Sequence, residues 1–292
     1  MKLIDFYDSV LKFGIDRDVR GRNKKINYFA DTALLYGNPQ AEVQSIMVGI
    51  DIEVPELLLA DRLRQKGELD LVLAHHPEGK AYAGLYKVMQ LQVDMLIKAG
   101  FPKVAAQEFL TDRKREVERR ILPQNHMRSV DAARLLDMPF MCVHTPADNH
   151  VSHYLFELMK EEQPKRLSDV IDILLGISEY KEAAGYGAGP QIILGNPKRQ
   201  VGKVFMEMTG GTEGHRDVYG RLYKCGIRTL ICMHLSEEHF KKVKDANLNV
   251  IIAGHISSDT LGLNLILDRI ENQAKQKFHF VECSGFRRVR RN

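Results

Sequence analysis

The sequence contains no tryptophan and only four cysteines in 292 residues. The four cysteines are Cys142, Cys225, Cys232 and Cys283. They show no C-x-x-C spacing, and three of the four lie in or beside apolar runs. This pattern favours buried, reduced thiols over disulfides or a thiolate metal site. A metal bound by this chain would therefore be held by imidazole and carboxylate groups.

Long apolar runs are also lacking. No stretch approaches the ~20 residues that a membrane-spanning helix needs, and the first ten residues, MKLIDFYDSV, are too acidic and interrupted for a signal peptide. The chain has no G-x-S-x-G elbow and neither the Walker nor the dinucleotide fingerprint. We therefore expect a cytoplasmic protein without a membrane partner, and catalysis by an activated serine is poorly supported.

An excess of one charge is absent as well. The 42 Lys and Arg residues nearly balance the 38 Asp and Glu residues, which leaves a formal charge of +4. This charge is too weak to predict nucleic-acid binding without a localised basic patch. The one dense basic run, RRVRR at 287–291, is expected to be a solvated tail or to form ion pairs between subunits.

The composition is that of an ordinary globular protein, with 44% hydrophobic and 27% charged residues. Predicted strands alternate with predicted helices, which indicates parallel α/β layers. The strands are expected at 45–50, 69–74, 140–143, 203–208, 229–233 and 249–253. We expect two α/β domains, residues 1–162 and residues 163–292.

A long helical stretch separates the second and third predicted strands. It is expected to form an insertion over about 82–136, with helices at 82–99, 103–122 and 129–136. This length exceeds that of an ordinary crossover between parallel strands. The insertion is expected either to cap a site or to contact another subunit.

The adjacent pair His75 and His76 follows the apolar run 69–74. Ligands of open α/β sheets bind at the carboxyl ends of the strands, where this pair is expected to lie. Neighbouring residues on an extended chain project to opposite faces, which suits two metal ions better than one. A single histidine here would more often be a hydrogen-bonded structural residue than a metal ligand. Whether other metal-binding side chains are expected nearby therefore decides between the two interpretations.

Two later strands carry such partners at their ends. The run 140–143 leads into His144 and Asp148, and the run 249–253 leads into His255 and Asp259 at a probable helix start capped by Ser257 or Ser258. Burying several imidazoles and carboxylates without a cation would be costly. We therefore predict that two divalent transition-metal ions (Zn, Mn, Fe, Co or Ni) are bound. The predicted ligands are His75, His76, Asp148, His255 and Asp259.

Three other histidines are candidates for acid–base catalysis or for contacts that support the ligands: His144, His150 and His234. His234 follows a predicted strand in the same pattern as His255, so it is expected at the same edge of the sheet. The segment GGTEGH at 210–215 joins a predicted strand to a predicted helix. It could wrap a phosphate, or it could simply form a tight turn.

Together these motifs resemble the YbgI-like dinuclear-metal-centre family, known as GTP cyclohydrolase I type 2 homologues and related to the eukaryotic Ngg-one-interacting factors. The family's His-His, His-x-Pro-x-Asp and Gly-His-x-x-x-Glu patterns correspond to His75 and His76, to His144, Pro146 and Asp148, and to Gly254, His255 and Asp259. Aspartate at 259 is one methylene shorter than the family's glutamate. Asp259 must therefore reach the second metal by a backbone shift, bind it through a water molecule, or leave it more weakly bound.

The resemblance implies two α/β domains with a metal pair between them, in a hexameric ring whose sites face an internal cavity. Our leading hypothesis is a hydrolase that cleaves a small phosphate- or nucleotide-bearing substrate with a metal-bridging water. The alternatives are a metal-binding or metal-delivery protein without turnover, and a regulatory scaffold whose metals stabilise the ring. An enzyme should keep a polar cavity beside the metals, whereas a storage site should be closed.

Overall fold

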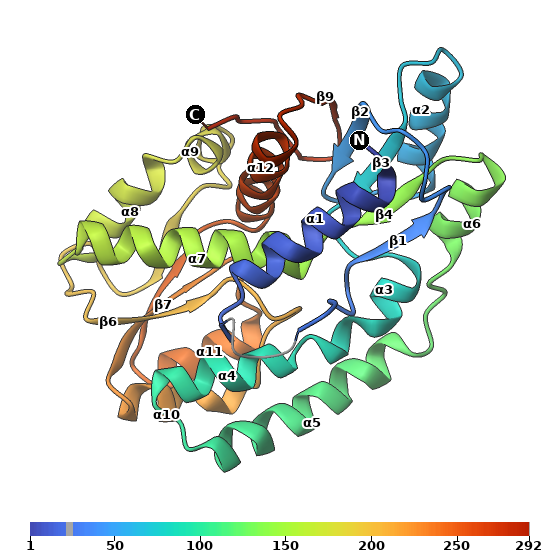
Figure 1. Cartoon of the computed structure of the whole chain (residues 1–292). Helices are drawn as coiled ribbons and strands as arrows, with labels where there is room; N and C mark the ends of the chain where they lie inside the picture. The colour runs from blue at the N-terminus through green and yellow to red at the C-terminus, as the bar shows by residue number, and fades with distance from the viewer. Residues whose placement is uncertain (22–25, 292) are drawn as a thin grey trace.

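The computed structural model describes residues 1–21 and 26–291, and it contains two sheets with helices around and between them (Figure 1). The first sheet has the strand order β1-β4-β3-β2-β9. Its strands are β1 (Ala33–Tyr36), β2 (Ser45–Gly49), β3 (Leu71–Ala74), β4 (Phe140–Cys142) and β9 (His279–Glu282). β2, β3, β4 and β9 run parallel, and β1 is antiparallel to β4.

The second sheet has the order β5-β8-β7-β6. Its strands are β5 (Gln191–Leu194), β6 (Lys203–Glu207), β7 (Ile227–Cys232) and β8 (Asn249–Ile252). β6, β7 and β8 are parallel, and β5 is an antiparallel edge. The predicted α/β class is confirmed, and the structure contains two parallel-rich sheets.

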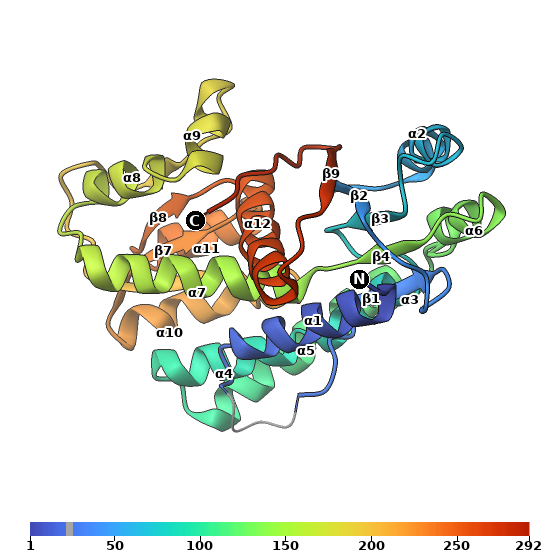
Figure 2. The ribbon, with the colours of Figure 1, turned by 45° about the horizontal axis from the view of Figure 1, so that its top comes forward.

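Two long helices, α7 (Thr145–Glu162) and α12 (His255–Ala274), pack against each other between the sheets. Figure 2 shows α12 in the middle of the molecule, with β7 and β8 on one side and β2 and β3 on the other. The two helices approach closely at Gly262, where a Cβ atom would lie 2.5 Å from the carbonyl oxygen of Ala147. Helix α1 (Leu3–Asp16) covers both of them. Because α7 follows β4 and α12 follows β8, this packing brings the carboxyl ends of strands from both sheets together.

The helical insertion is present, and it spans the two sheets. It contains α3 (Gly79–Gly84), the 3-10 turn η1 (Leu85–Lys87), α4 (Gln90–Ala99), α5 (Lys103–Ile121) and α6 (Arg128–Leu135). Apolar residues of α4 and α5 share a core with β7, β8 and α10 (Tyr219–Lys224) of the second sheet. The insertion thus leaves the first sheet and covers one face of the second.

The structure adds elements that the sequence pattern did not reveal. Strands β1, β5 and β9 are short edge strands of four residues each, and their side chains are mostly exposed or only partly buried. Because β9 pairs with β2, the end of the chain belongs to the first sheet, and residues 163–292 do not form a separate unit. The remaining helices are α2 (Val54–Arg64), α8 (Leu167–Leu175), α9 (Ser178–Gly185), the 3-10 turn η2 (Arg216–Val218) and α11 (Glu237–Asp245).

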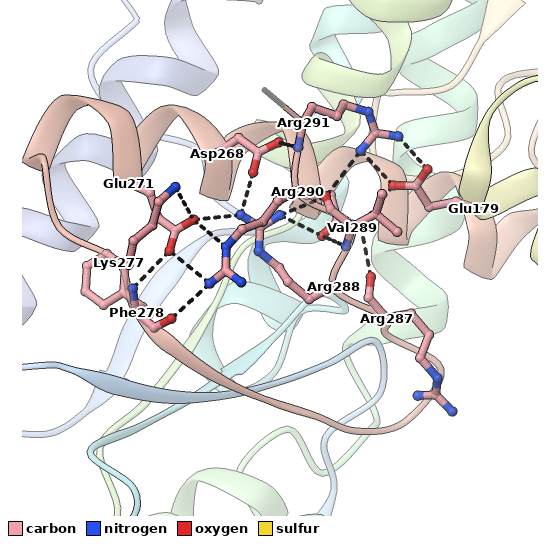
Figure 3. A network of polar contacts seen from close by, with 11 residues as sticks. Glu179, Asp268, Glu271, Lys277, Phe278, Arg287, Arg288, Val289, Arg290 and Arg291 are labelled. Atoms are coloured by element: carbon pink, nitrogen blue, oxygen red, sulfur yellow. Dashed lines mark hydrogen bonds and ion pairs between the residues drawn. The ribbon is translucent and has the colours of Figure 1, made fainter.

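The basic C-terminal run is not a solvated tail. Residues 286–291, here called the C-terminal strap, fold back onto α12 and α9 (Figure 3). The buried carboxylate of Glu271 pairs with Arg288 at 3.0 Å and with Arg290 at 3.1 Å. Arg291 pairs with Glu179 of α9 at 2.5 Å. These ion pairs lie within the chain, which corrects the expectation of a free tail or of ion pairs between subunits.

All four cysteines are free thiols, and Cys142 and Cys232 are buried. Across residues 1–21 and 26–291, no helix has both the length and the apolar character needed to cross a membrane.

Candidate metal centre

The cluster forms where β3, β4 and β8 end. His75 and His76 directly follow β3, whose four residues are fully buried. His144 precedes α7 and His255 begins α12, and each helix carries an aspartate four residues after that histidine, Asp148 or Asp259. A spacing of four residues puts the two side chains on the same face of a helix. The packing of α7 against α12 therefore brings two His–Asp pairs to the histidines that follow β3.

Asp259 is the centre of this cluster. Its Oδ1 atom lies 3.4 Å from His75 Nε2, whereas its Oδ2 atom lies 3.4 Å from His76 Nε2 and 3.5 Å from His255 Nε2. The side chain is only 1% exposed. The shorter aspartate thus reaches the histidines, and each of its oxygens faces a different set of nitrogens.

Asp148 completes the other side. Its Oδ1 atom lies 3.4 Å from His75 Nε2, and its Oδ2 atom lies 3.9 Å from His144 Nε2. Potential ligand atoms within 4.8 Å of one another form three groups: His75, Asp148 and Asp259; His76, His255 and Asp259; and His75, His76 and His144. All five predicted ligands are therefore brought together, and His144 joins them.

Buried atoms without partners test whether these residues suit a metal. Four such atoms have no hydrogen-bond partner among the described residues: His75 Nε2, Asp148 Oδ1, Asp259 Oδ1 and Asp259 Oδ2. Leaving buried polar atoms unpaired costs roughly 1–3 kcal/mol each, and more when they are charged. A cation among them would remove this cost. Imidazole nitrogens and carboxylate oxygens are ligands of divalent transition metals, so the residues fit such ions.

The far ring nitrogens of the histidine pair are held by other groups. His76 Nδ1 lies 2.6 Å from Asp51 Oδ1, and His75 Nδ1 lies 3.0 Å from the carbonyl oxygen of Val143. When each Nδ1–H donates a hydrogen bond to its oxygen, the Nε2 atom of the neutral ring carries no hydrogen and faces the cluster. Nε2 is then the atom that can bind a metal ion. In the sequence, Asp51 is only the residue that follows the predicted strand at 45–50.

His144 is oriented in the same way by a residue that sequence reasoning missed. Its Nδ1 lies 2.8 Å from Oδ2 of the buried Asp31, which also accepts a hydrogen bond from the Thr145 hydroxyl at 2.6 Å. Asp31 precedes β1, a strand that the sequence pattern did not reveal. Because no motif surrounds Asp31, only the tertiary structure identifies it.

The carboxylates control the protonation of the histidine pair. Burial by itself would lower the pKa of His75, but Asp259 and Asp148 outweigh it and raise that pKa to about 10. For His76, Asp259 and Asp51 likewise outweigh burial and raise the pKa to about 9. The histidines in turn hold the pKa of Asp259 well below its usual range, although burial opposes this. Metal ions must therefore displace protons near neutral pH, and metal affinity should increase with pH.

The two other candidate histidines differ in position. His234 lies beside the cluster, with its ring centroid 4.8 Å from that of His255, and the neighbouring Glu213 raises its pKa. His150 is not part of the cluster. Its Nδ1 is 2.7 Å from its own helix carbonyl at Pro146, its Nε2 is 3.2 Å from Arg269, and burial lowers its pKa to about 3. We therefore withdraw His150 as an acid–base candidate.

A cavity of about 470 Å³ adjoins the cluster. One wall consists of His76, His144, His234 and His255, and another consists of insertion residues that include Tyr82, Gln124 and Arg128. The insertion therefore lies beside the site and lines one side of the cavity. It also holds the 210–215 segment, because Gln92 of α4 donates to the carbonyl oxygens of Gly210 (2.9 Å) and Thr212 (2.6 Å).

We predict that Asp31→Asn weakens metal binding. Within the cluster Asp31 contacts only His144, so its effect on the metal would be indirect. Residues that orient a ligand typically contribute 10–100-fold to metal affinity, so we expect a loss of about tenfold or more. Chelator competition would measure it. Asp137→Asn, which changes an exposed carboxylate paired with Arg64, is the matched control. Equal affinities for Asp31→Asn and the wild type would show that His144 needs no orientation for metal binding.

The chain is similar in fold to several solved structures. No family model matches the chain, and no curated protein matches it. Among solved structures, a NIF3 superfamily protein from Sphaerobacter thermophilus is similar, with a TM-score of 0.78 and 27% sequence identity over 95% of this chain and 97% of that one.

Two further structures are similar in fold alone. Reduced HcgD from Methanocaldococcus jannaschii has a TM-score of 0.58 at 13% identity, covering 97% of both chains. The protein ybgI, described as of unknown function, has a TM-score of 0.51 at 15% identity, covering 97% of this chain and 98% of that one. The structural neighbours thus include a NIF3 superfamily protein and ybgI, and the expected resemblance is confirmed.

Proposed function

We propose that this chain, a YbgI/NIF3-like protein by its fold and its structural neighbours, binds two divalent transition-metal ions and hydrolyses a small phosphate- or nucleotide-bearing substrate. The proposed ligands are His75, His76, Asp148, His255 and Asp259, with His144 as a further candidate. The division of the two Asp259 oxygens between His75 on one side and His76 with His255 on the other supports two ions rather than one.

The cavity of about 470 Å³ is the observation that favours an enzyme. A structural or storage site is normally closed by its ligands, whereas a catalytic site keeps space for substrate. Here His76 and His255 are 27% and 40% exposed, and both line the cavity. This supports turnover over the alternatives of metal delivery and of a regulatory scaffold.

The chain's own residues would support hydrolysis as follows. Two bound divalent ions supply Lewis acidity and lower the pKa of water. His234 Nδ1 lies 3.8 Å from Glu213 Oε1, so Glu213 can hold the ring while Nε2 exchanges a proton with the substrate. Insertion residues line one side of the cavity. Assembly into a homohexamer and a cytoplasmic location remain predictions.

Metal content is the first test. Protein purified without added metal should contain close to two ions per chain by elemental analysis. His76→Ala should lose at least one ion while its circular dichroism stays that of the wild type, because His76 is a partly exposed ligand. Wild-type protein that is metal-free after gentle purification would contradict the proposal.

Turnover is the second part of this test. Protein reconstituted with each candidate metal would be screened against phosphoesters, nucleotides and cyclic amides. For a substrate that is cleaved, His234→Ala should lower kcat by about 100-fold or more while metal content stays at the wild-type value. Full metal content without turnover of any phosphoester or nucleotide would favour the metal-delivery alternative.

A further inference from the structure

Helix α12 begins without a cap. Its N-cap is Gly254, which has a φ of 115° and no side chain to offer, and the backbone N–H groups of residues 255–257 make no hydrogen bond to the described parts of the chain. The hydroxyl of Ser257, a residue only 6% exposed, also has no described partner. A helix of 20 residues thus starts with several unsatisfied hydrogen-bond donors in largely buried surroundings.

A second cavity, of about 500 Å³, lies against this helix start. Its lining comes from three segments: His255, Ile256 and Ser257 of α12; Glu182, Ala183, Tyr186 and Ala188 of α9 and the glycine-rich loop after it; and Gly285 with Arg287 of the C-terminal strap. His255 lines both this cavity and the one beside the metal centre. The ring of one proposed metal ligand therefore adjoins both spaces.

Arg287 supplies positive charge to this second cavity. Its nearest carboxylates, Glu182 and Glu282, each lie 3.9 Å from its Nε atom, and Arg287 and Glu182 are both 52% exposed. Exposed pairs at this distance are weak. Its Nη1 donates to the carbonyl oxygen of Phe286, whereas no described residue pairs with its Nη2. The guanidinium can therefore bind an anion in the cavity without losing a strong ion pair.

We propose that this second cavity binds the phosphate group of a small phosphorylated molecule. Backbone N–H groups at a helix N-terminus attract anions, and a buried hydroxyl and a guanidinium add further donors. The set suits the three terminal oxygens of a phosphate better than the two of a carboxylate. As a subsite for the substrate it rests on the proposed function, whereas phosphate binding itself requires no metal.

The position of Tyr186 indicates a further property of the ligand. Its side chain is 67% exposed at the edge of the cavity, between Gly185 and Gly187. An exposed aromatic ring beside an anion site offers a surface on which a planar group can stack. The phosphate ligand is therefore one that carries a planar ring.

Titration of metal-free protein with inorganic phosphate, followed by calorimetry, tests the subsite. Arg287→Ala should weaken phosphate binding about tenfold, because a charge-assisted hydrogen bond is lost. Ser257→Ala should also weaken it, yet should leave the melting temperature without phosphate unchanged or higher, since its hydroxyl has no protein partner. Lys241→Ala, which removes an exposed positive charge paired with Glu237 on α11, should leave phosphate binding unchanged. Glu182→Gln should tighten it.

Phenyl phosphate and acetate complete the experiment. Phenyl phosphate should bind more tightly than inorganic phosphate, and Tyr186→Ala should abolish this difference; acetate should bind more weakly than either. Absence of phosphate binding in the wild type, or equal affinities in the wild type, Arg287→Ala and Ser257→Ala, would overturn the proposal. Wild-type protein that binds phosphate but contains no metal after gentle purification would count against the proposed function alone, because phosphate binding itself requires no metal.

Discussion

Asp259→Asn will abolish binding of both proposed metal ions, whereas His76→Ala leaves the ligands of the second proposed ion intact. The reason is the position of the carboxylate, because Oδ1 faces His75 and Oδ2 faces His76 and His255. An asparagine side chain has no charge and only one oxygen. We expect metal affinity to fall by more than about 100-fold at both positions, since even residues that only orient ligands contribute 10–100-fold. Elemental analysis and chelator competition would measure the loss.

An independent measurement distinguishes loss of a metal ligand from general disruption of the fold. In the metal-free protein, Asp259 raises the pKa of both His75 and His76, so Asp259→Asn should lower both pKa values in an NMR titration. Asp259→Glu should keep both ions and bind the weaker one more tightly if the shorter side chain limits affinity. Retention of one full ion per chain in Asp259→Asn would show that the carboxylate does not bridge two ions.

Glu271→Ala will strongly destabilise the fold although Glu271 is remote in sequence from the strap it holds. Its side chain is fully buried and contacts Arg288, Arg290 and the backbone N–H of Phe278 (Figure 3). Removing one partner of a buried ion pair leaves the other charges uncompensated and costs about 3–5 kcal/mol. Urea unfolding at pH 7 should show this loss. Glu237→Ala, which removes an exposed carboxylate on α11, should change the unfolding free energy by less than about 0.5 kcal/mol.

The effect of Glu271 should depend on pH with a defined sign. Burial opposes ionisation, but Arg290, the N–H of Phe278 and Arg288 lower the pKa of Glu271 from 4.5 to about 2. A carboxylate with a lowered pKa stabilises the fold above its unfolded pKa and loses this effect as the pH falls through its folded pKa. The wild type and Glu271→Ala should therefore differ fully above about pH 4.5 and converge toward pH 2. A difference below 1 kcal/mol at pH 7 would contradict a structural role for the strap.

Local patterns in the sequence predict much of the candidate metal centre. The apolar runs before His75, His144 and His255 are strands β3, β4 and β8, because continuous apolar runs form the buried strands of parallel sheets. The carboxyl ends of parallel strands share one edge, so the order of residues alone predicted that His75, His76, Asp148, His255 and Asp259 would meet. The spacing of four residues between His255 and Asp259 places both side chains on one face as soon as the segment forms a helix.

Contacts between segments remote in sequence could not be predicted in this way. Asp31 orients His144, and β9 joins β2, through pairings that no local pattern encodes. His150 belongs to the same donor-rich segment as Asp148 but lies outside the cluster, because residues two apart on a helix point in different directions.

The chain's sequence by itself thus determined the α/β class and the residue types at the strand ends, since both follow from local hydrophobic pattern and spacing. Only the tertiary structure decided how the donors are divided between two sets of nitrogens, which aspartates orient the histidines, and where the basic C-terminal run lies. These features depend on the packing of α7 against α12 and on the return of the chain to the first sheet. Such packing reflects side chains far apart in sequence, which no pattern of neighbouring residues records.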